Sequence, residues 1–524
     1  MNSHRIYAFR GAVLASAALL LSSIPGPAQE PAPSTARDAA SIRELQDQIR
    51  ELRTLVDAMR VENAQSRAEM RQLREDLQAT RAALEKPAAT GGAAAAPAAA
   101  AAGTTTPAGN QASGSLENRV DKLEESTSLM GSKIDEQYET KVETASKYRA
   151  RLHGIILMNA FRNVGSSDSL DLPTYAEPVP RGWPVANAGA TLRQSEVGVE
   201  IFGPTVAGAK TSADVQLDFA GGFPDTGNGV NFGLVRLQTA SLRLDWQHTS
   251  VVAGQDTLFI SPLSPTSFAS LALPAFAFAG NLWAWTPQLR VEHRFSVSDQ
   301  QTITMQAGVF DNLDWEFPYN QFNRTPQAGE LSGQPAYGAR AAWSRPVHDH
   351  ALSFGAAGYY GRQNWTWGRY VDAWAGMADW EIPILARLEL SGEFYRGVGI
   401  GGLGAAVGTS IVYGGNPRFP FSPIRGVDAA GGWAQLKFRL TPKLELNAAA
   451  SEDDAFTGNI RGFATDANNF GPIIGRNQGA LGNIVFRPRS DLILAGELRR
   501  LHTFPVYSSS SMTNEASVSA GILF

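Results

Sequence analysis

Charged and apolar residues alternate in several segments, and this alternation decides what chemistry the charges can perform. Arg290 and Arg294 stand on one side of an extended chain, while Leu289, Val291 and Phe295 stand on the other. A guanidinium group can hold a carboxylate or a phosphate in two hydrogen bonds. A side of alternating arginines therefore predicts a surface that attracts or guides small anions.

The same spacing places other cations on the polar side of extended segments, and together they form the set of candidate site residues. Arg290 directly follows the long uncharged segment 260–285 and Arg243 precedes it, so these two are the first candidates. The alternative is that each cation only neutralises a carboxylate of the same side, such as Glu292 or Glu389. The full set is Arg290, Arg243, Arg294, Arg340, Arg387, Lys437 and Arg439, together with Arg193 and Arg236, which stand on strands where the alternation does not decide the side.

The alternation itself is the pattern of half-buried β-strands, which a soluble sandwich and a membrane barrel share. Two features favour the barrel: the polar side carries charges on strand after strand, and the connections alternate in length. The stretches "QHT", "TPK" and "RPRSD" predict tight turns. The predicted long connections are 163–190, 221–231, 260–285, 312–334, 397–428, 452–477 and 502–514. The predicted fold is an all-β transmembrane barrel of about 16 antiparallel strands over residues 148–524.

The last nine residues, "ASVSAGILF", also alternate. Val518, Ala520, Ile522 and Phe524 share one side of the strand, while Ser517 and Ser519 lie on the other. We expect this strand to pair with the first one, near residues 152–161, so that the barrel has no open edge. The apolar side would then face lipid.

The N-terminal part predicts export and association. Residues 1–28 have a basic start, a short apolar stretch and small residues before Ala28, which together predict a signal peptide. In 41–85, apolar residues repeat in heptads from Ile42 to Leu84, and pairs such as Glu69 and Arg74 suit contacts between chains. Residues 86–115 form an Ala/Pro/Gly linker, and 116–145 a second, short coiled-coil segment. We expect these segments in the periplasm.

Several stretches resemble the DcaP-type trimeric porins of Gram-negative outer membranes. They are "RLHGIILMNAFRN", "TLRQSEVGVEIFGP", "ASLRLDWQHTSVVAGQDTLF" and "PQLRVE", together with the coiled coil, the barrel layout and the terminal Phe. This resemblance implies passive uptake of small anionic solutes, such as dicarboxylates, by a homotrimer in the outer-membrane lipid. The segment "ISPLSPTSFASLALPAFAFAGNLWAW" departs from the family pattern, and we expect it to fold inward and narrow the pore.

Other functions find little support in the sequence. The absence of Cys excludes a disulfide framework and a Cys nucleophile, and a net charge of −5 does not favour a nucleic-acid partner. The stretch "HDH" (348–350) lies in a predicted short turn and lacks an obvious third ligand, so it does not predict a metal site. We expect no enzymatic activity, no cofactor and no metal. Two alternatives stay open: a phosphate-selective porin, and an envelope-organising barrel whose coiled coil binds peptidoglycan or a periplasmic partner. A barrel-embedded hydrolase has the least support.

Overall fold

The computed structural model describes residues 149–223, 233–312, 314, 324–347, 350–415, 419–463 and 473–524. They all belong to the second of two compact units, Asn110–Phe524. The predicted signal peptide, both coiled-coil segments and the linker lie outside the described residues.

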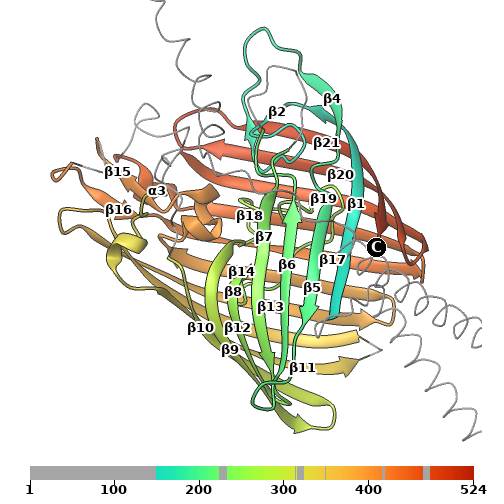
Figure 1. Ribbon diagram of the computed structural model, residues 1–524. Coiled ribbons are helices and arrows are strands. Elements are labelled where there is room, and N and C mark those ends of the chain that lie inside the picture. Colours follow the sequence, from blue (N-terminus) through green and yellow to red (C-terminus); the bar gives the residue numbers. More distant parts are fainter. Residues whose placement is uncertain are drawn as a thin grey trace, which may run out of the picture. The chain divides into compact units, whose positions relative to one another are not determined.

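Antiparallel strands form one closed sheet (Figure 1). Seventeen strand segments are hydrogen-bonded in a ring, but β4 and β5 occupy one position because both pair with β1, so the barrel has sixteen strands. This confirms the predicted barrel and strand number. The segments are β1 (Arg149–Val164), β4 (Ala186–Thr191), β5 (Glu196–Phe202), β6 (Lys210–Asp218), β7 (Arg236–Asp245), β8 (Thr249–Thr257), β9 (Trp285–Ser298), β10 (Gln301–Phe310), β11 (Ala336–Val347), β12 (His350–Asn364), β13 (Tyr370–Leu385), β14 (Leu388–Val398), β17 (Asp428–Thr441), β18 (Leu444–Ala455), β19 (Ile474–Arg489), β20 (Leu492–Pro505) and β21 (Ser511–Leu523).

The first and last strands close the ring. β1 pairs with β21 in a register that runs from Ile155 opposite Leu523 to Val164 opposite Asn514. Beyond the end of β21, Phe524 and Gly154 exchange both backbone hydrogen bonds, with N···O distances of 3.0 and 3.1 Å. The predicted pairing of the C-terminal strand is therefore confirmed.

Side chains alternate between the inside and the outside of the barrel, as the sequence pattern predicts. On β1, Leu157 is fully buried, whereas its neighbours Ile156 and Met158 are 60% and 50% exposed. On β21, Val518 is exposed and Ser517 is buried. A protein in water does not expose a continuous ring of large apolar side chains, so this outer surface suits hydrocarbon.

The connections also follow a rule. Short turns lie at one end of the barrel, at 203–209, 246–248, 299–300, 386–387, 442–443 and 490–491. Long connections such as 258–284 and 399–427 begin at the other end. One predicted long connection is wrong: β20 and β21 continue through most of 502–514, and only 506–510 link them. We refer below to the short-turn end and the long-connection end.

Small elements lie within the long connections. β2 (Ser166–Ser167) pairs with β3 (Ala176–Glu177), and β15 (Ile411–Tyr413) pairs with β16 (Ile424–Gly426). Short helical turns are η1 (Glu330–Ser332), η2 (Gly401–Leu403), η3 (Ala405–Gly408) and α3 (Thr457–Ile460). None of the helices in the described ranges has the length and apolarity needed to cross a bilayer.

Candidate functional site: the barrel lumen

The segment 258–284 between β8 and β9, called the inner loop below, lies against the inner wall of the barrel. Near its start, Phe259 stacks on Phe310 of β10 with ring centroids 5.0 Å apart. Near its tip, Phe268 and Leu271 pack against a cluster that includes Leu157 of β1 and Val485 of β19. Inner-facing residues on opposite sides of the ring thus contact one loop, which confirms that it folds inward.

Polar groups of the wall anchor the first half of the inner loop. The buried Glu393 of β14 accepts hydrogen bonds from the Leu263 backbone N–H (2.7 Å) and the Ser261 hydroxyl (2.5 Å). On β17, the Gln435 carbonyl oxygen accepts one from the Thr266 backbone N–H (2.7 Å). Each anchor satisfies a loop group that would otherwise be buried without a partner, which stabilises the inward conformation.

The tip of the inner loop is held from two further directions. The side chain of Gln194, which links β4 to β5, accepts from Leu271 N–H (2.7 Å) and donates to the Ala269 carbonyl (2.9 Å). On β20, Arg499 donates to the hydroxyls of two loop serines at 3.1 and 3.3 Å. On β7, Arg236 donates to the Ala272 carbonyl at 2.6 Å. The tip therefore spans the lumen to the wall near β5 and β7.

The returning half of the inner loop approaches the wall very closely at Gly280. A Cβ at this position would lie 2.4 Å from the Gly432 carbonyl oxygen and 2.5 Å from that of Glu452, and its φ is +110°. Only glycine tolerates both the contact and the dihedral. The inner loop also contains no Asp, Glu, Lys or Arg, so the charges of the lumen come from the strands.

Arg290 of β9 is buried and doubly paired. Its Nη1 donates to Asp256 at 2.7 Å and its Nε donates to Glu292 at 2.9 Å. Its guanidinium carbon also lies 5.9 Å from the ring centre of Phe259, at the start of the inner loop. Arg290 thus lies beside the loop as expected, but its donors already serve carboxylates.

Arg243 and Arg294 lie nearer the short-turn end and differ in their partners. Arg243 donates to Asp245 at 2.7 Å and approaches Glu292 at 3.4 Å. Arg294 reaches only the Ser250 hydroxyl, at 3.3 Å, and forms no ion pair with a carboxylate in the described part of the chain. Arg294 is therefore freer to meet an anion from solution than Arg243.

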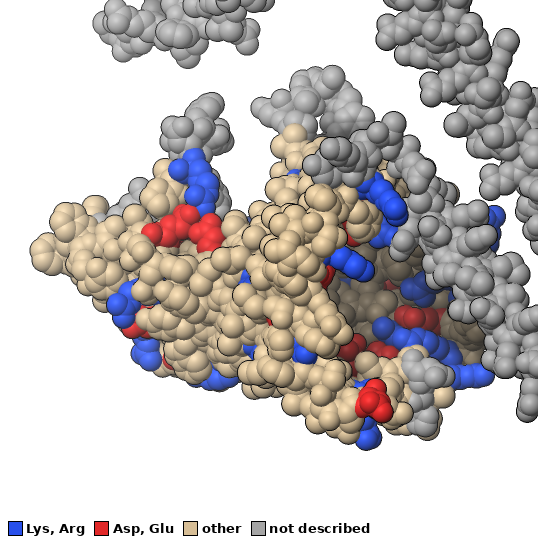
Figure 2. All heavy atoms as spheres, turned by 60° about the horizontal axis from the view of Figure 1, so that its bottom comes forward, with Lys and Arg blue, Asp and Glu red and all other residues tan. Residues whose placement is uncertain are grey.

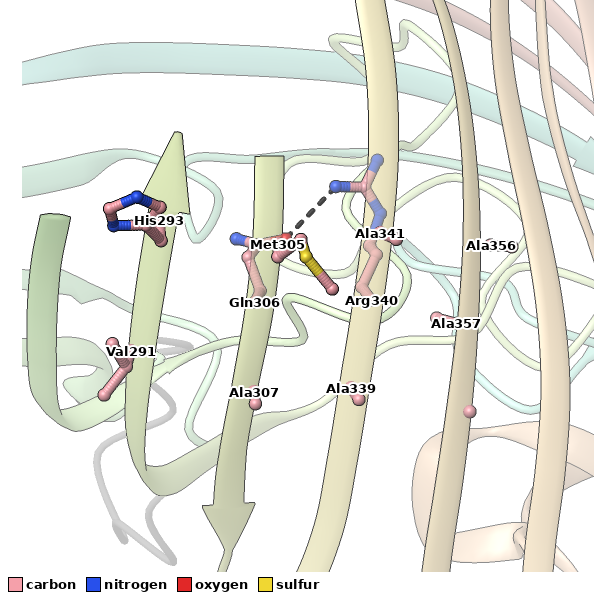
Figure 3. Close-up of a pocket in the computed structure, with 11 residues that line it drawn as sticks. Val291, His293, Met305, Gln306, Ala307, Ala339, Arg340, Ala341, Ala356 and Ala357 are labelled. Atoms are coloured by element: carbon pink, nitrogen blue, oxygen red, sulfur yellow. Dashed lines mark hydrogen bonds between the residues drawn. The ribbon is translucent and has the colours of Figure 1, made fainter. Parts of the chain in front are cut away.

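Arg340 of β11 points toward β13. It forms a two-bond ion pair with Asp379, at 2.7 and 2.9 Å, and its Nη1 donates to Gln306 of β10 at 3.1 Å (Figure 3). The side chains around Arg340 are small. Ala307, Ala339 and other alanines of β10–β12 leave the barrel wall thin at this point.

Arg193 and Arg236 are paired near the long-connection end. Arg193 lies in the break between β4 and β5 and holds both oxygens of Asp171, at 2.5 and 3.0 Å. Arg236 holds both oxygens of the fully buried Asp218 in the same way, at 2.5 and 3.1 Å. These two-bond pairs connect chain segments and help to fix the wall near the loop tip.

The remaining candidates lie at the short-turn end. Lys437 and Arg439 both approach Glu389, at 3.9 and 3.4 Å, and Arg439 also contacts the ring of His350. Arg387 was predicted on a strand, but it lies in the two-residue turn 386–387 because β13 extends to Leu385. It is exposed and donates to the Leu440 carbonyl at 3.4 Å.

The short-turn end of the lumen is an open, charged mouth, in which Figure 2 shows blue and red side chains around a hollow. Cations at this end that form no ion pair with any carboxylate that the structure describes include Arg149, Lys210, Arg294, Arg387 and Lys443. We call them the mouth cations. The carboxylates of this end are mostly paired, as with Glu200 to Arg151 (2.5 Å) and Glu445 to Arg487 (3.6 Å). The unpaired charge at the mouth is therefore mainly positive.

Sequence reasoning missed the residues that hold the inner loop. Glu393 alternates like any lumen carboxylate, and the polar residues Gln194, Gln435 and Arg499 gave no signal of their own. Their partners are backbone groups or serines of a loop more than 70 residues away in the sequence. The many serines of the uncharged segment were the only available hint that it needs polar partners.

The "HDH" stretch gives no support to metal chemistry. His348 and Asp349 lie outside the described residues, and His350 lies beside the Arg439 guanidinium, a poor neighbour for a metal ion. Within the ranges that the structure describes, no group of three His, Cys, Asp or Glu side chains is arranged to hold a metal.

At the long-connection end, the β2–β3 hairpin covers part of the barrel edge. Burial raises the pKa of the Asp168 carboxyl, although the N–H groups of Tyr175 and Thr174 and the Thr174 hydroxyl donate to it and oppose the shift. Burial and the nearby Asp168 charge raise the pKa of Tyr175 to about 12. The hairpin is fastened to β20 where Ala176 N–H donates to the Thr503 hydroxyl at 2.7 Å.

A comparison with solved structures identifies the fold. The barrel is similar to the outer-membrane channel DcaP of Acinetobacter baumannii, with a TM-score of 0.54, 14% identity and coverage of 73% of this chain and 99% of that one. The chain has the fold of an outer-membrane channel. More distant matches include an anion-selective porin from Comamonas acidovorans (TM-score 0.44, 12% identity, 72% and 100% covered) and Pseudomonas putida OprB (0.42, 13%, 72% and 94%). No protein-family model and no curated protein sequence matches the chain.

Proposed function

We propose that the chain is a diffusion porin of the Gram-negative outer membrane that passes small solutes and prefers anions such as dicarboxylates. A sixteen-strand barrel is wide enough to enclose water, and its exposed outer side chains suit lipid. The fold shared with an outer-membrane channel supports this proposal.

The observation that carries the anion preference is the contrast between the inner loop and the mouth. The loop narrows the lumen without contributing any charge, so fixed charge elsewhere must set the selectivity. At the short-turn end, mouth cations such as Lys210 and Arg294 have no ionic partner among the described residues. Their field raises the local concentration of anions at this end of the pore.

The proposal includes an assembly. We propose a homotrimer whose signal peptide (1–28) directs export and whose coiled coil (41–85) lies in the periplasm, joining three barrels. The heptad pattern of that segment supports association between copies. Peptidoglycan is the proposed partner of this coiled coil, and small anions are the proposed solutes.

Reconstitution of the full chain in a planar bilayer tests the proposal. We expect closure in three steps, as for three pores, and a reversal potential in a salt gradient that favours anions. Cation preference would contradict the proposed solute class. Complete absence of conductance would contradict the porin itself and favour the envelope-organising alternative.

A further inference from the structure

Two arginines stand on the outer face of the barrel without an acidic partner. Some other outer-face arginines are neutralised by carboxylates: Arg362 donates to Asp372 at 2.7 Å, and Arg396 to Asp428 at 2.8 Å. Two more, Arg345 and Arg476, lie over the aromatic rings of Trp343 and Phe504. Arg162 and Arg500, both exposed, form no ion pair within the described ranges. An unpaired cation on a face that otherwise suits hydrocarbon costs free energy unless an anion meets it there.

The two side chains are neighbours across one strand. Arg162 of β1 is opposite Ala516 of β21, and Arg500 of β20 is opposite Asn514 of the same strand. The strands that carry the arginines are therefore separated by β21 alone, which corresponds to about 10 Å. The Arg500 Nε donates to the Asn514 side-chain oxygen at 2.8 Å, which leaves its terminal nitrogens available. Flexible arginine side chains can bring both guanidinium groups to one phosphate.

A shallow trough of about 440 Å³ lies beside these arginines on the outer face. Its apolar walls include Val164 and Leu498, which are 42% and 68% exposed. Small residues of β19 and β21 form the bottom: Ala480, Gly482 and Ala516. The trough can therefore take an unbranched hydrocarbon chain that runs away from the two cations.

A second hollow on the outer face has a similar size but lacks such cations. It measures about 500 Å³ and lies over β9–β12, between Val291, Met305 and a row of alanines (Figure 3). The only arginine beside it, Arg340, turns into the lumen and binds Asp379. An apolar hollow alone is thus compatible with any lipid chain, whereas the trough beside Arg162 and Arg500 distinguishes lipids by charge.

The position of the two arginines along the barrel is the level at which lipid headgroups are expected. Arg162 stands two residues before the end of β1, at the long-connection end, where the strand leaves the apolar zone. On β18, which β19 separates from β20, the outer-face Glu452 accepts a hydrogen bond from Gln478 of β19 at 2.5 Å. β19 and its Gln478 thus separate this acid from Arg500, so a net positive site remains.

We infer that Arg162, Arg500 and the trough beside them bind an anionic, phosphate-bearing lipid of the surrounding bilayer. Its phosphate lies between the two guanidinium groups and one acyl chain lies in the trough. The inference rests on the membrane location in the proposed function, but it does not depend on which solute the pore conducts.

Native mass spectrometry of the full chain in detergent tests the inference, with phosphatidylglycerol as the probe and phosphatidylcholine as the zwitterionic comparator. We expect tighter binding of phosphatidylglycerol. Each arginine beside an anionic lipid contributes about fivefold in affinity, so the R162Q/R500Q double variant should bind phosphatidylglycerol about 25-fold more weakly. The matched variant R362Q removes an outer-face arginine that already has a carboxylate partner, and it should bind as the unchanged protein does.

Further measurements keep the outcomes distinct. A516L fills the trough and should weaken both lipids, whereas R162Q/R500Q should act mainly on phosphatidylglycerol. Equal binding of the two lipids by the unchanged protein, or an unaffected double variant, would overturn the inference. Inorganic phosphate that competes as well as phosphatidylglycerol would also overturn it, because the site would then hold free phosphate. Bilayer conductance of the same samples separates a failure of the porin proposal from a failure of this one.

Discussion

The wall under the inner loop and the short-turn mouth use polar side chains in opposite ways. Under the loop, Glu393 and Gln435 each serve backbone groups of the loop and are buried. At the mouth, Lys210 and Arg294 lie without an ionic partner among the described residues. Where water is excluded, a polar side chain must be satisfied by the protein. Where water remains, a charge can stay unpaired and act on solutes.

The prediction with the largest expected effect concerns deletion of the inner loop. Replacing residues 262–273 with two glycines should leave the barrel intact, because its strands pair independently of the loop, and should raise single-channel conductance by at least about twofold. Shortening the exposed segment 178–184 is the matched control and should leave conductance unchanged. An unchanged conductance in the loop variant would mean that the narrowest point lies elsewhere.

A second prediction concerns the Glu393 anchor. In Glu393→Ala, the buried Leu263 N–H and Ser261 hydroxyl lose their acceptor, which should destabilise the inward loop by about 1–3 kcal/mol. Hydrogen exchange at the Leu263 amide should become correspondingly faster. Glu381→Ala is the control, because that carboxylate accepts from Ser353 at 3.1 Å and makes no described contact with the loop. Faster exchange in both variants would speak against a specific anchor.

A smaller effect is expected when single lumen arginines are replaced, and its salt dependence should differ between an arginine in an ion pair and one without. Arg294→Gln should reduce anion preference at low salt, and the change should disappear near 1 M salt, where charges are screened within about 3 Å. Arg290→Gln should also reduce anion preference, but its effect should persist at high salt because it leaves Asp256 and Glu292 without their partner beside the loop. Reversal potentials at both salt concentrations measure this. Identical salt dependence in the two variants would contradict the distinction.

The smallest expected effect lies outside the lumen, in the β2–β3 cap. Because the folded pKa of Asp168 is raised, its contribution to stability is fully present below the unfolded value of about 3.9 and is lost as pH rises through the folded pKa. Amides of Thr174 and Tyr175 should therefore be better protected near pH 3.5 than at neutral pH, after correction for intrinsic exchange. Asp168→Asn should remove this dependence; its persistence would assign it to another group.

The alternation of residues predicted the strands, their two faces and the closing pair, because a period of two follows directly from strand geometry. The inward loop was predicted from a different feature, the length and lack of charge of segment 260–285. Arg387 was misplaced since alternation continues through a two-residue turn without a visible break. Ion pairs escaped prediction for a different reason: Arg290 and Asp256 are 34 residues apart and meet only through the register of β8 and β9. The alternation of residues along one strand determines which face of the sheet a side chain lies on. The pairing register between two strands determines which side chain of the next strand lies beside it.

The seam between β1 and β21 has a consequence for how the molecule folds. Every other adjacent pair of barrel strands is close in sequence, but this pair joins residues at least 350 positions apart. Closing so long a segment has the greatest entropic cost of any pairing, so we expect this seam to form last. The ring of Phe524 occupies the space where a Cβ of Gly154 would lie, 2.9 Å from its Cζ atom. The same Cβ would lie 2.3 Å from the Glu196 carbonyl oxygen of β5, so a bulkier residue at 154 should disturb the pairing of β1 with both of its neighbours, the closing strand included.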